Sequence, residues 1–332
     1  MAQPSPRVAA GRAVQIDWPL SEEDPAHMKV HIDTDIGGDT DDLCALAMVL
    51  AAPNVEVVGI TTVADRDGRR AAYVRHALKL AGADGIPVAS GAFGFLGGEP
   101  HEPGLQDERY WPDLAAEPPG RAGAAVDLLH ANVEAGATVI AIGPYTNLAV
   151  LEVMRPGAFD RASLVVMGGN VLPPAAGLPQ WDPAMDYNVQ ADRVAARIVF
   201  ERLHPLIVPI EATVRTGLCR SDLSRLRRGG PLAQVIADQA ELYAQDTGIA
   251  EQVAANPGLP RDLLNYQHDP FACAVALGWE CFSAREFRLG VTEREGQLAL
   301  VEDAQGRDLR VVTDVGSAVF SGRWLDAVAG LS

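Results

Sequence analysis

The most informative stretch of this 332-residue chain is His31-Ile-Asp-Thr-Asp-Ile-Gly-Gly-Asp-Thr-Asp-Asp42. A short apolar run, Met28 to Ile32, leads into it, and Leu43-Cys-Ala-Leu-Ala-Met-Val-Leu-Ala-Ala52 follows with the aliphatic and small residues of a buried helix. This order predicts a strand, a loop and a helix, in which Gly37 and Gly38 let the loop turn tightly. Open α/β sheets bind ligands where their strands end, so we expect a site at this loop.

Five aspartates crowd into these twelve residues, and no lysine or arginine lies among them. One or two would be explained as helix caps, because Asp accepts the free N–H groups of a first helical turn. Five carboxylates repel one another unless a cation holds them, which favours a hard metal such as calcium or magnesium. An EF-hand is excluded, since the twelfth position of such a loop would be Cys44 or Leu46 instead of glutamate. An acidic, solvated loop with a capping Asp is the alternative.

Strand and helix patterns alternate along the rest of the chain, and 48% of its residues are hydrophobic. Strand patterns occupy 55–63, 164–170 and 206–213, a strand and then a helix 137–149, paired strands 287–301 and 310–315, and a closing helix 318–328. Together they predict a single α/β domain over residues 28–332, with a doubly wound, mostly parallel sheet and helices on both faces. Residues 1–27, rich in Pro, Ala and acids, are predicted to form a flexible N-terminal extension.

The formal net charge of -17 argues against a nucleic-acid backbone as partner. The first 27 residues contain no continuous apolar run, so we expect neither a signal peptide nor a membrane partner. The cysteines are scattered without a CxxC pair: Cys44, Cys219, Cys273 and Cys281. Reduced thiols in apolar surroundings favour a cytoplasmic protein.

A second unusual cluster lies far along the chain, where Asn265-Tyr-Gln-His-Asp-Pro-Phe leads into an apolar helix. Pro270 at the first helical position and Asp269 as a cap would be explained by helix structure alone. His268 beside them is not explained in that way.

The two clusters together resemble the inosine-uridine-preferring nucleoside hydrolase family. Its amino-terminal signature is a strand, an Asp-x-Asp, a Gly-containing turn and a paired Asp-Asp, which Asp33 to Asp42 resembles with about two extra residues around Asp39. The resemblance runs from about Lys29 to the end of the chain. It implies a Rossmann-like nucleoside hydrolase fold and calcium-dependent hydrolysis of the N-glycosidic bond of ribonucleosides, in purine or pyrimidine salvage. It also implies a neutral nucleoside as substrate and a homodimer or homotetramer.

The resemblance assigns roles to particular residues. It implies a calcium ion held by Asp35, Asp42, Asp269 and the backbone carbonyl of Ile142, which stands before a Gly-Pro-x-Thr-Asn motif. Asp35 would also accept a proton from the attacking water, and His268 would protonate the departing base. Asp33 would support the ligands from behind, and Asp39 has no assigned role.

Other residues are implied on the substrate side. Ribose contacts are expected from Asp41, Met167, Asn170, Asp186 and Asn188, and Trp181 is the candidate for contacting the base. The family has Glu-x-Asn where this chain has Asp186-Tyr-Asn188, so the shorter acid leaves recognition of the sugar's 5′ end open. His101, in the Gly/Pro-rich segment 93–119, is a further candidate contact, and Asp65 a weaker one. Helix capping by Asp186 and Asn188, and loop charge at Asp65, are the structural alternatives.

Two other functions remain as alternatives. A catalytically silent calcium- or ribose-binding member of the same fold would explain the altered Asp186 and Asp65 regions. A phosphatase-like hydrolase of the Asp-x-Asp type is disfavoured, because the only lysines are Lys29 and Lys79. The preference for a purine or a pyrimidine base is left open.

Overall fold

The computed structural model describes residues 11–14, 28–97, 109–111, 114, 120–121 and 123–331. The predicted contact residue His101 and most of the predicted extension 1–27 lie outside these residues. Both therefore stay predictions.

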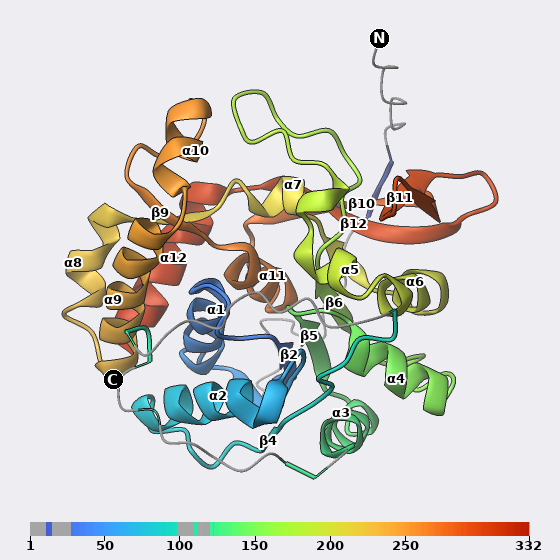
Figure 1. Cartoon of the computed structure of the whole chain (residues 1–332), viewed down its shortest axis with the longest axis horizontal. Coiled ribbons are helices and arrows are strands. Elements are labelled where there is room, and N and C mark those ends of the chain that lie inside the picture. The colour runs from blue at the N-terminus through green and yellow to red at the C-terminus, as the bar shows by residue number, and fades with distance from the viewer. Residues whose placement is uncertain are drawn as a thin grey trace.

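A ten-stranded sheet runs through the centre of the molecule (Figure 1). Its strands are β1 (Arg12–Val14), β2 (Met28–Thr34), β3 (Val55–Thr62), β4 (Val88–Ala89), β5 (Thr138–Ala141), β6 (Leu164–Met167), β7 (Leu206–Val208), β10 (Phe282–Arg294), β11 (Gln297–Glu302) and β12 (Arg307–Val315). They lie in the order β1-β10-β12-β7-β6-β5-β2-β3-β4, with β11 beside β10. Strands β8 (Gly217–Cys219) and β9 (Leu263–Tyr266) form a separate antiparallel pair.

The sheet is parallel from β12 across to β4, and antiparallel only around β10. The chain builds β2, β3 and β4 outward in one direction, and then returns to place β5 on the other side of β2. This reversal separates the loops that leave β2 and β5 and opens a crevice between them. In doubly wound folds such a switch point is where ligands bind.

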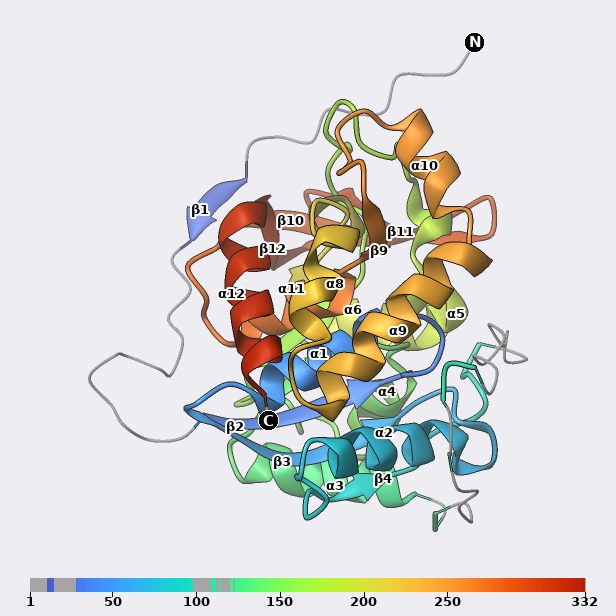
Figure 2. The same ribbon diagram turned by 90° about the vertical axis from the view of Figure 1, so that its left-hand side faces the viewer.

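Helices cover both faces of the sheet. They are α1 (Asp41–Leu50), α2 (Arg69–Leu80), α3 (Ala124–Glu134), α4 (Thr146–Met154), α5 (Tyr187–Ala191), α6 (Arg193–Arg202), α7 (Ile210–Thr213), α8 (Leu223–Leu226), α9 (Pro231–Asp246), α10 (Ile249–Ala255), α11 (His268–Ala276) and α12 (Ser317–Gly330), with short 3-10 turns at Arg66–Gly68, Pro183–Met185 and Arg220–Asp222. One core contains residues of α1, α2, α8, α9, α11 and α12, and the other contains residues of α3, α4 and α6. Figure 2 views the molecule from the side that carries α8, α9 and α12.

Strand residues alternate between these two cores, as the two-residue period of a strand requires. In β6, Val165 and Met167 belong to the first core, whereas Leu164 and Val166 belong to the second. The predicted doubly wound α/β fold is confirmed.

One predicted element is partly wrong. The strand expected at 206–213 ends at Val208, and Ile210–Thr213 form the short helix α7. Pro209 separates them, because proline has no N–H to donate to the neighbouring strand. Within the paired strands predicted from residue 287, β10 and β11 form a hairpin whose turn residues, Glu295 and Gly296, both have positive φ.

At the amino-terminal end, β1 pairs antiparallel with β10, and Arg12 Nη2 lies 2.9 Å from Glu286 Oε1. All the cysteines are free thiols, as predicted. None of the helices in the described ranges has the length and apolar character needed to cross a bilayer.

Candidate functional site

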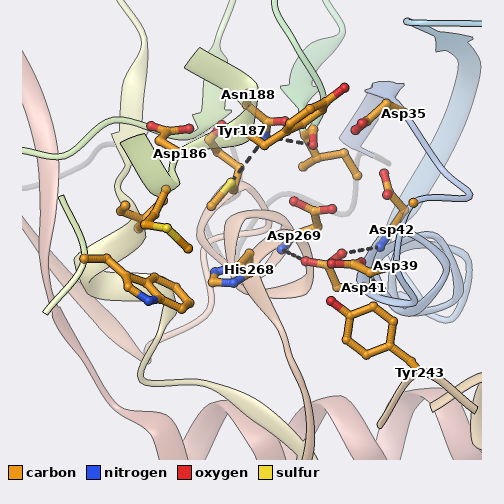
Figure 3. Close-up of a pocket in the computed structure, with 16 residues that line it drawn as sticks. Asp35, Asp39, Asp41, Asp42, Asp186, Tyr187, Asn188, Tyr243, His268 and Asp269 are labelled. Atoms are coloured by element: carbon orange, nitrogen blue, oxygen red, sulfur yellow. Dashed lines mark hydrogen bonds between the residues drawn. The ribbon is translucent and has the colours of Figure 1, made fainter. Parts of the chain in front are cut away.

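A cavity of about 300 Å³ lies beside the ends of β2, β5 and β6 (Figure 3). Most of the predicted site residues that the structure describes line it: Asp35, Asp41, Asp42, Ile142, Met167, Trp181, Asp186, Asn188, His268 and Asp269. Asn170 and Asp65 do not. The structure thus brings together residues from opposite ends of the chain. Asn170 instead lines a small recess beside Leu298 and Leu300, with its Nδ2 3.4 Å from Glu211 Oε2.

Residues 35–42, which we call the acidic loop, are held in their conformation by hydrogen bonds from their own side chains and from Thr34. Thr34, the last residue of β2, donates its hydroxyl proton to Oδ1 of Asp42. The amide of Asp41 donates to Oδ1 of Asp39 (2.9 Å), and the amide of Asp42 donates to Oδ1 of Asp41 (3.1 Å). These bonds tie the strand end, the loop and the first turn of α1 together, as Asp and Thr commonly do at turns and helix starts.

The late His-Asp pair reaches this loop because α11 packs against α1. The amide of Asp269 donates to Oδ2 of Asp41 (3.2 Å). Just before α11, the amide group of Asn265 donates to the hydroxyl of Thr40. The start of α11 is therefore bonded directly to the acidic loop, although 228 residues separate Asp41 from Asp269.

Burial raises the pKa of the four aspartates that surround this end of the cavity, namely Asp35, Asp41, Asp42 and Asp269. For Asp35 the value rises to about 6. Neighbouring carboxylates add to the effect of burial, with Asp269 acting on Asp41 and Asp35 acting on Asp42. Such a group of carboxylates is stable in its ionised form only when a cation lies beside it.

The donor atoms suit a hard divalent cation. Asp39, Asp41 and Asp42 each offer a carboxylate oxygen within 4.8 Å of the others. The carbonyl oxygen of Ile142 accepts a hydrogen bond from Asn188 Nδ2 (3.0 Å) and keeps a second lone pair for another partner. Oxygen-only donors are the ligands that calcium and magnesium prefer. Asp39, which the sequence left without a role, belongs to this carboxylate group.

Asp186 performs the helix-capping role that was its structural alternative. Its Oδ1 accepts from the amide of Val189 (3.2 Å), and its Oδ2 accepts from the amide of Gly169. Burial raises its pKa to about 6, and its side chain is only 2% exposed. Asn188 is also held in place, because its Nδ2 donates to the carbonyls of Ile142 and Met167. Both residues line the cavity. Their contacts with ribose stay predictions.

His268 lines the cavity and lies across it from Asp35 and Asp42 (Figure 3). Its Nδ1 lies 2.6 Å from the hydroxyl oxygen of Thr213, and burial lowers its pKa to about 4. The ring centroids of Trp181 and Tyr266 lie 5.9 and 5.3 Å from the imidazole centroid. Tyr243 of α9 also lines the cavity. No role was predicted for Tyr243, which belongs to no motif, or for Tyr266, which lies two residues before His268 in the Asn265 to Phe271 stretch.

Two further aspartates have purely internal partners. Asp65 accepts from the backbone amide of Arg70 (2.8 Å) and the hydroxyls of Thr62 (2.6 Å) and Ser90 (2.8 Å), so it holds the start of α2 and does not line the cavity. Asp33 is fully buried, and its Oδ1 accepts from Asn147 Nδ2 (2.7 Å). Its supporting role behind the metal ligands stays a prediction.

Glu211 in α7 is a buried acid for which no sequence motif predicted a role. Its Oε1 accepts from the amides of Val171 (3.0 Å) and Leu172 (2.8 Å), so it holds the segment that follows β6. Burial is the main cause that raises its pKa from 4.5 to about 7.

This shift predicts a pH dependence of stability. The unfolded chain loses the Glu211 proton at lower pH than the folded protein does, so stability falls as pH rises from about 4.5 to 7. In Glu211→Gln this loss is absent. We expect urea unfolding in chelator to show the variant gaining about 3 kcal/mol relative to wild type between pH 4.5 and pH 8. Parallel pH profiles of the two proteins would show that Glu211 titrates normally.

A doubly wound α/β sheet with an aspartate-rich cavity at its switch point defines the class of α/β proteins that bind a ligand there, with a candidate metal site. Residues 30–321 match the family model of the inosine-uridine preferring nucleoside hydrolases, and the chain belongs to this family of N-glycosyl hydrolases. The resemblance seen in the sequence is confirmed.

Curated relatives and solved structures agree with this assignment. The chain is 29% identical over 284 residues to the pyrimidine-specific ribonucleoside hydrolase RihA of Klebsiella pneumoniae subsp. pneumoniae, which covers 81% of this chain and 86% of the relative. The fold of this chain is similar to that of a purine-preferring ribonucleoside hydrolase from Gardnerella vaginalis. The TM-score is 0.76 and the identity 20%, over 92% of this chain and 99% of that one. A plant nucleoside hydrolase gives a TM-score of 0.73 at 21% identity, covering 91% and 99% of the two chains.

Proposed function

We propose that this protein hydrolyses the N-glycosidic bond of ribonucleosides to free base and ribose, with calcium as cofactor. The observation that carries the proposal is the shared cavity, in which the acidic loop faces His268 and its aromatic neighbours. Cleavage of this bond develops positive charge on the ribose ring and negative charge on the base. The two walls of the cavity match these opposite needs.

On the acidic wall, calcium would be held by Asp35, Asp42, Asp269 and the carbonyl of Ile142. When bound, calcium supplies positive charge that lowers the pKa of a water molecule beside it. Asp35 would accept the proton of that water, since burial has already raised its pKa to about 6, close to the working pH of a general base. Asp41 and Asn188 would bind the ribose hydroxyls, because a carboxylate accepts and an amide both accepts and donates.

On the opposite wall, His268 would deliver a proton to the departing base. The contact between Nδ1 and the Thr213 hydroxyl oxygen (2.6 Å) holds the imidazole in place, and the tautomer that carries its proton on Nε2 would supply that proton to the base. Trp181 packs edge to face on Tyr266, with ring centroids 5.2 Å apart, and offers an aromatic surface for a flat base. The base therefore meets both a proton donor and a stacking surface.

Release of free ribose from a panel of inosine, guanosine, adenosine, uridine and cytidine tests the proposal directly. We expect release from at least one of them, and loss of release in chelator with recovery on adding calcium. The relatives differ in base preference, being named pyrimidine-specific in one case and purine-preferring in another, so the panel also assigns the base class. No ribose from any nucleoside, with calcium still raising the thermal midpoint, would favour the catalytically silent binder.

We further propose a cytoplasmic homodimer or homotetramer. The support for the compartment is the set of free thiols, of which Cys44, Cys273 and Cys281 are buried. The particle mass in solution tests the oligomeric state.

A further inference from the structure

An arginine is buried directly behind the acidic loop. The loop itself contains no lysine or arginine. Arg70 belongs to the first turn of α2, and only 2% of its surface is exposed. Its Nη1 donates to the carbonyl oxygen of Ile36 (2.9 Å), which lies inside the acidic loop 34 positions earlier in the chain. Arginine is rarely buried to this degree without a charge partner.

The other guanidinium contact connects the same loop to the end of β3. Arg70 Nε donates to the carbonyl oxygen of Ala64 (2.9 Å), a residue with the positive φ of 51° that L residues rarely adopt. The guanidinium thus bridges two loops at the carboxyl ends of adjacent strands, β2 and β3. Its helix is held in turn by Asp65, which accepts the backbone amide of Arg70. The position of the cation is therefore determined from both sides.

The charge of Arg70 acts on the proposed calcium ligands. Ile36, whose carbonyl oxygen the guanidinium contacts, directly follows Asp35 in the chain, so the positive charge lies beside this carboxylate. Among the described residues that line the cavity there is no lysine or arginine, so this positive charge reaches the carboxylates from outside that lining. A cation fixed behind a metal site and a cation bound within it are attracted to the same carboxylates and repel each other.

We propose that Arg70 is a positioning residue that serves as the internal counter-ion of the acidic loop, holding its carboxylates in place while the metal is absent and weakening metal affinity in exchange. The proposal rests on the proposed metal site. A divalent cation then enters a loop that is already folded around Ile36. Removing the charge of Arg70 destabilises the metal-free protein more than the metal-bound one, because only the former depends on the guanidinium for compensation.

Two variants separate charge from shape. Arg70→Met loses both the charge and the carbonyl contacts, whereas Arg70→Lys loses the planar fork and keeps the charge. Isothermal titration with calcium chloride should show Arg70→Met binding calcium on the order of tenfold more tightly than Arg70→Lys. In thermal melts, calcium should raise the midpoint of Arg70→Met by more than that of wild type, and the midpoint of Arg70→Lys by about as much as that of wild type.

Arg75→Met is the matched control. Arg75 lies on the same helix and also donates to a backbone carbonyl, that of Val88 (3.0 Å), but Val88 belongs to β4 and not to the acidic loop. Its calcium-induced shift should equal that of wild type. Equal calcium affinities of Arg70→Met and Arg70→Lys, or weaker binding by Arg70→Met, would overturn the counter-ion role. If wild type itself binds no calcium, the metal site fails and this role falls with it, which is a different result.

Discussion

Asp42→Asn abolishes the calcium-dependent gain in thermal midpoint and lowers kcat/KM on the best nucleoside by roughly 10²- to 10³-fold, as expected for loss of a charged group that organises the transition state. Asparagine has the shape of aspartate, so its oxygen can still accept the hydroxyl of Thr34 that holds the start of α1. What disappears is one negative charge from a buried cluster whose members raise one another's pKa. In chelator the variant should therefore melt no lower than wild type, which separates loss of a ligand from damage to the fold.

The control is Asp84→Asn, which removes the same charge from an exposed turn after α2. It should keep both activity and the calcium response. Calcium binding to Asp42→Asn with wild-type affinity would remove Asp42 from the set of ligands. Differential scanning fluorimetry with and without calcium, together with isothermal titration, measures both properties.

The second large effect is expected at His268, and it depends on the leaving group. His268→Gln should lower kcat on natural nucleosides by about 10²- to 10⁴-fold, the range over which general acids contribute. On 4-nitrophenyl riboside the loss should be less than about tenfold, because nitrophenolate departs without a proton. Steady-state kinetics on the two substrate types measure the difference.

A matched histidine serves as control for this experiment. His204 is exposed and contacts Arg307 far along the chain, so His204→Gln should alter neither rate. Similar losses of His268→Gln on nucleosides and on the nitrophenyl riboside would exclude proton donation and leave His268 as a residue that shapes the cavity.

Much of the fold could be predicted from the residue patterns of the sequence. Apolar runs with strand periodicity, each followed by a helical pattern, were enough to predict a doubly wound sheet, because backbone periodicity is a local property. The same holds for the two charged clusters, whose residue types and spacing point to metal binding and proton transfer. The prediction of a strand over 206–213 was wrong after Val208, since Ile210–Thr213 form the short helix α7 after Pro209.

Contacts between residues that lie far apart in the sequence could not be predicted in this way. Asp186 and, as a weaker candidate, Asp65 were both predicted to contact the sugar. Asp65 instead bonds to Thr62, Arg70 and Ser90, and of the two only Asp186 lines the cavity. Asn170 follows β6 as expected but lies in another recess beside Glu211. The difference depends on which way each loop turns after its strand, and that is set by packing.

The sequence by itself therefore determined the α/β class, the family and the two clusters of chemical groups, because these depend on residue type and local spacing. Only the tertiary structure decided that α1 and α11 meet, that Tyr243 lines the cavity while Tyr266 packs against His268, and that Arg70 lies buried behind the acidic loop. The physical reason is that burial and electrostatic interaction depend on distance through space. Residues 34 or 228 positions apart become neighbours only once the sheet and its helices have packed.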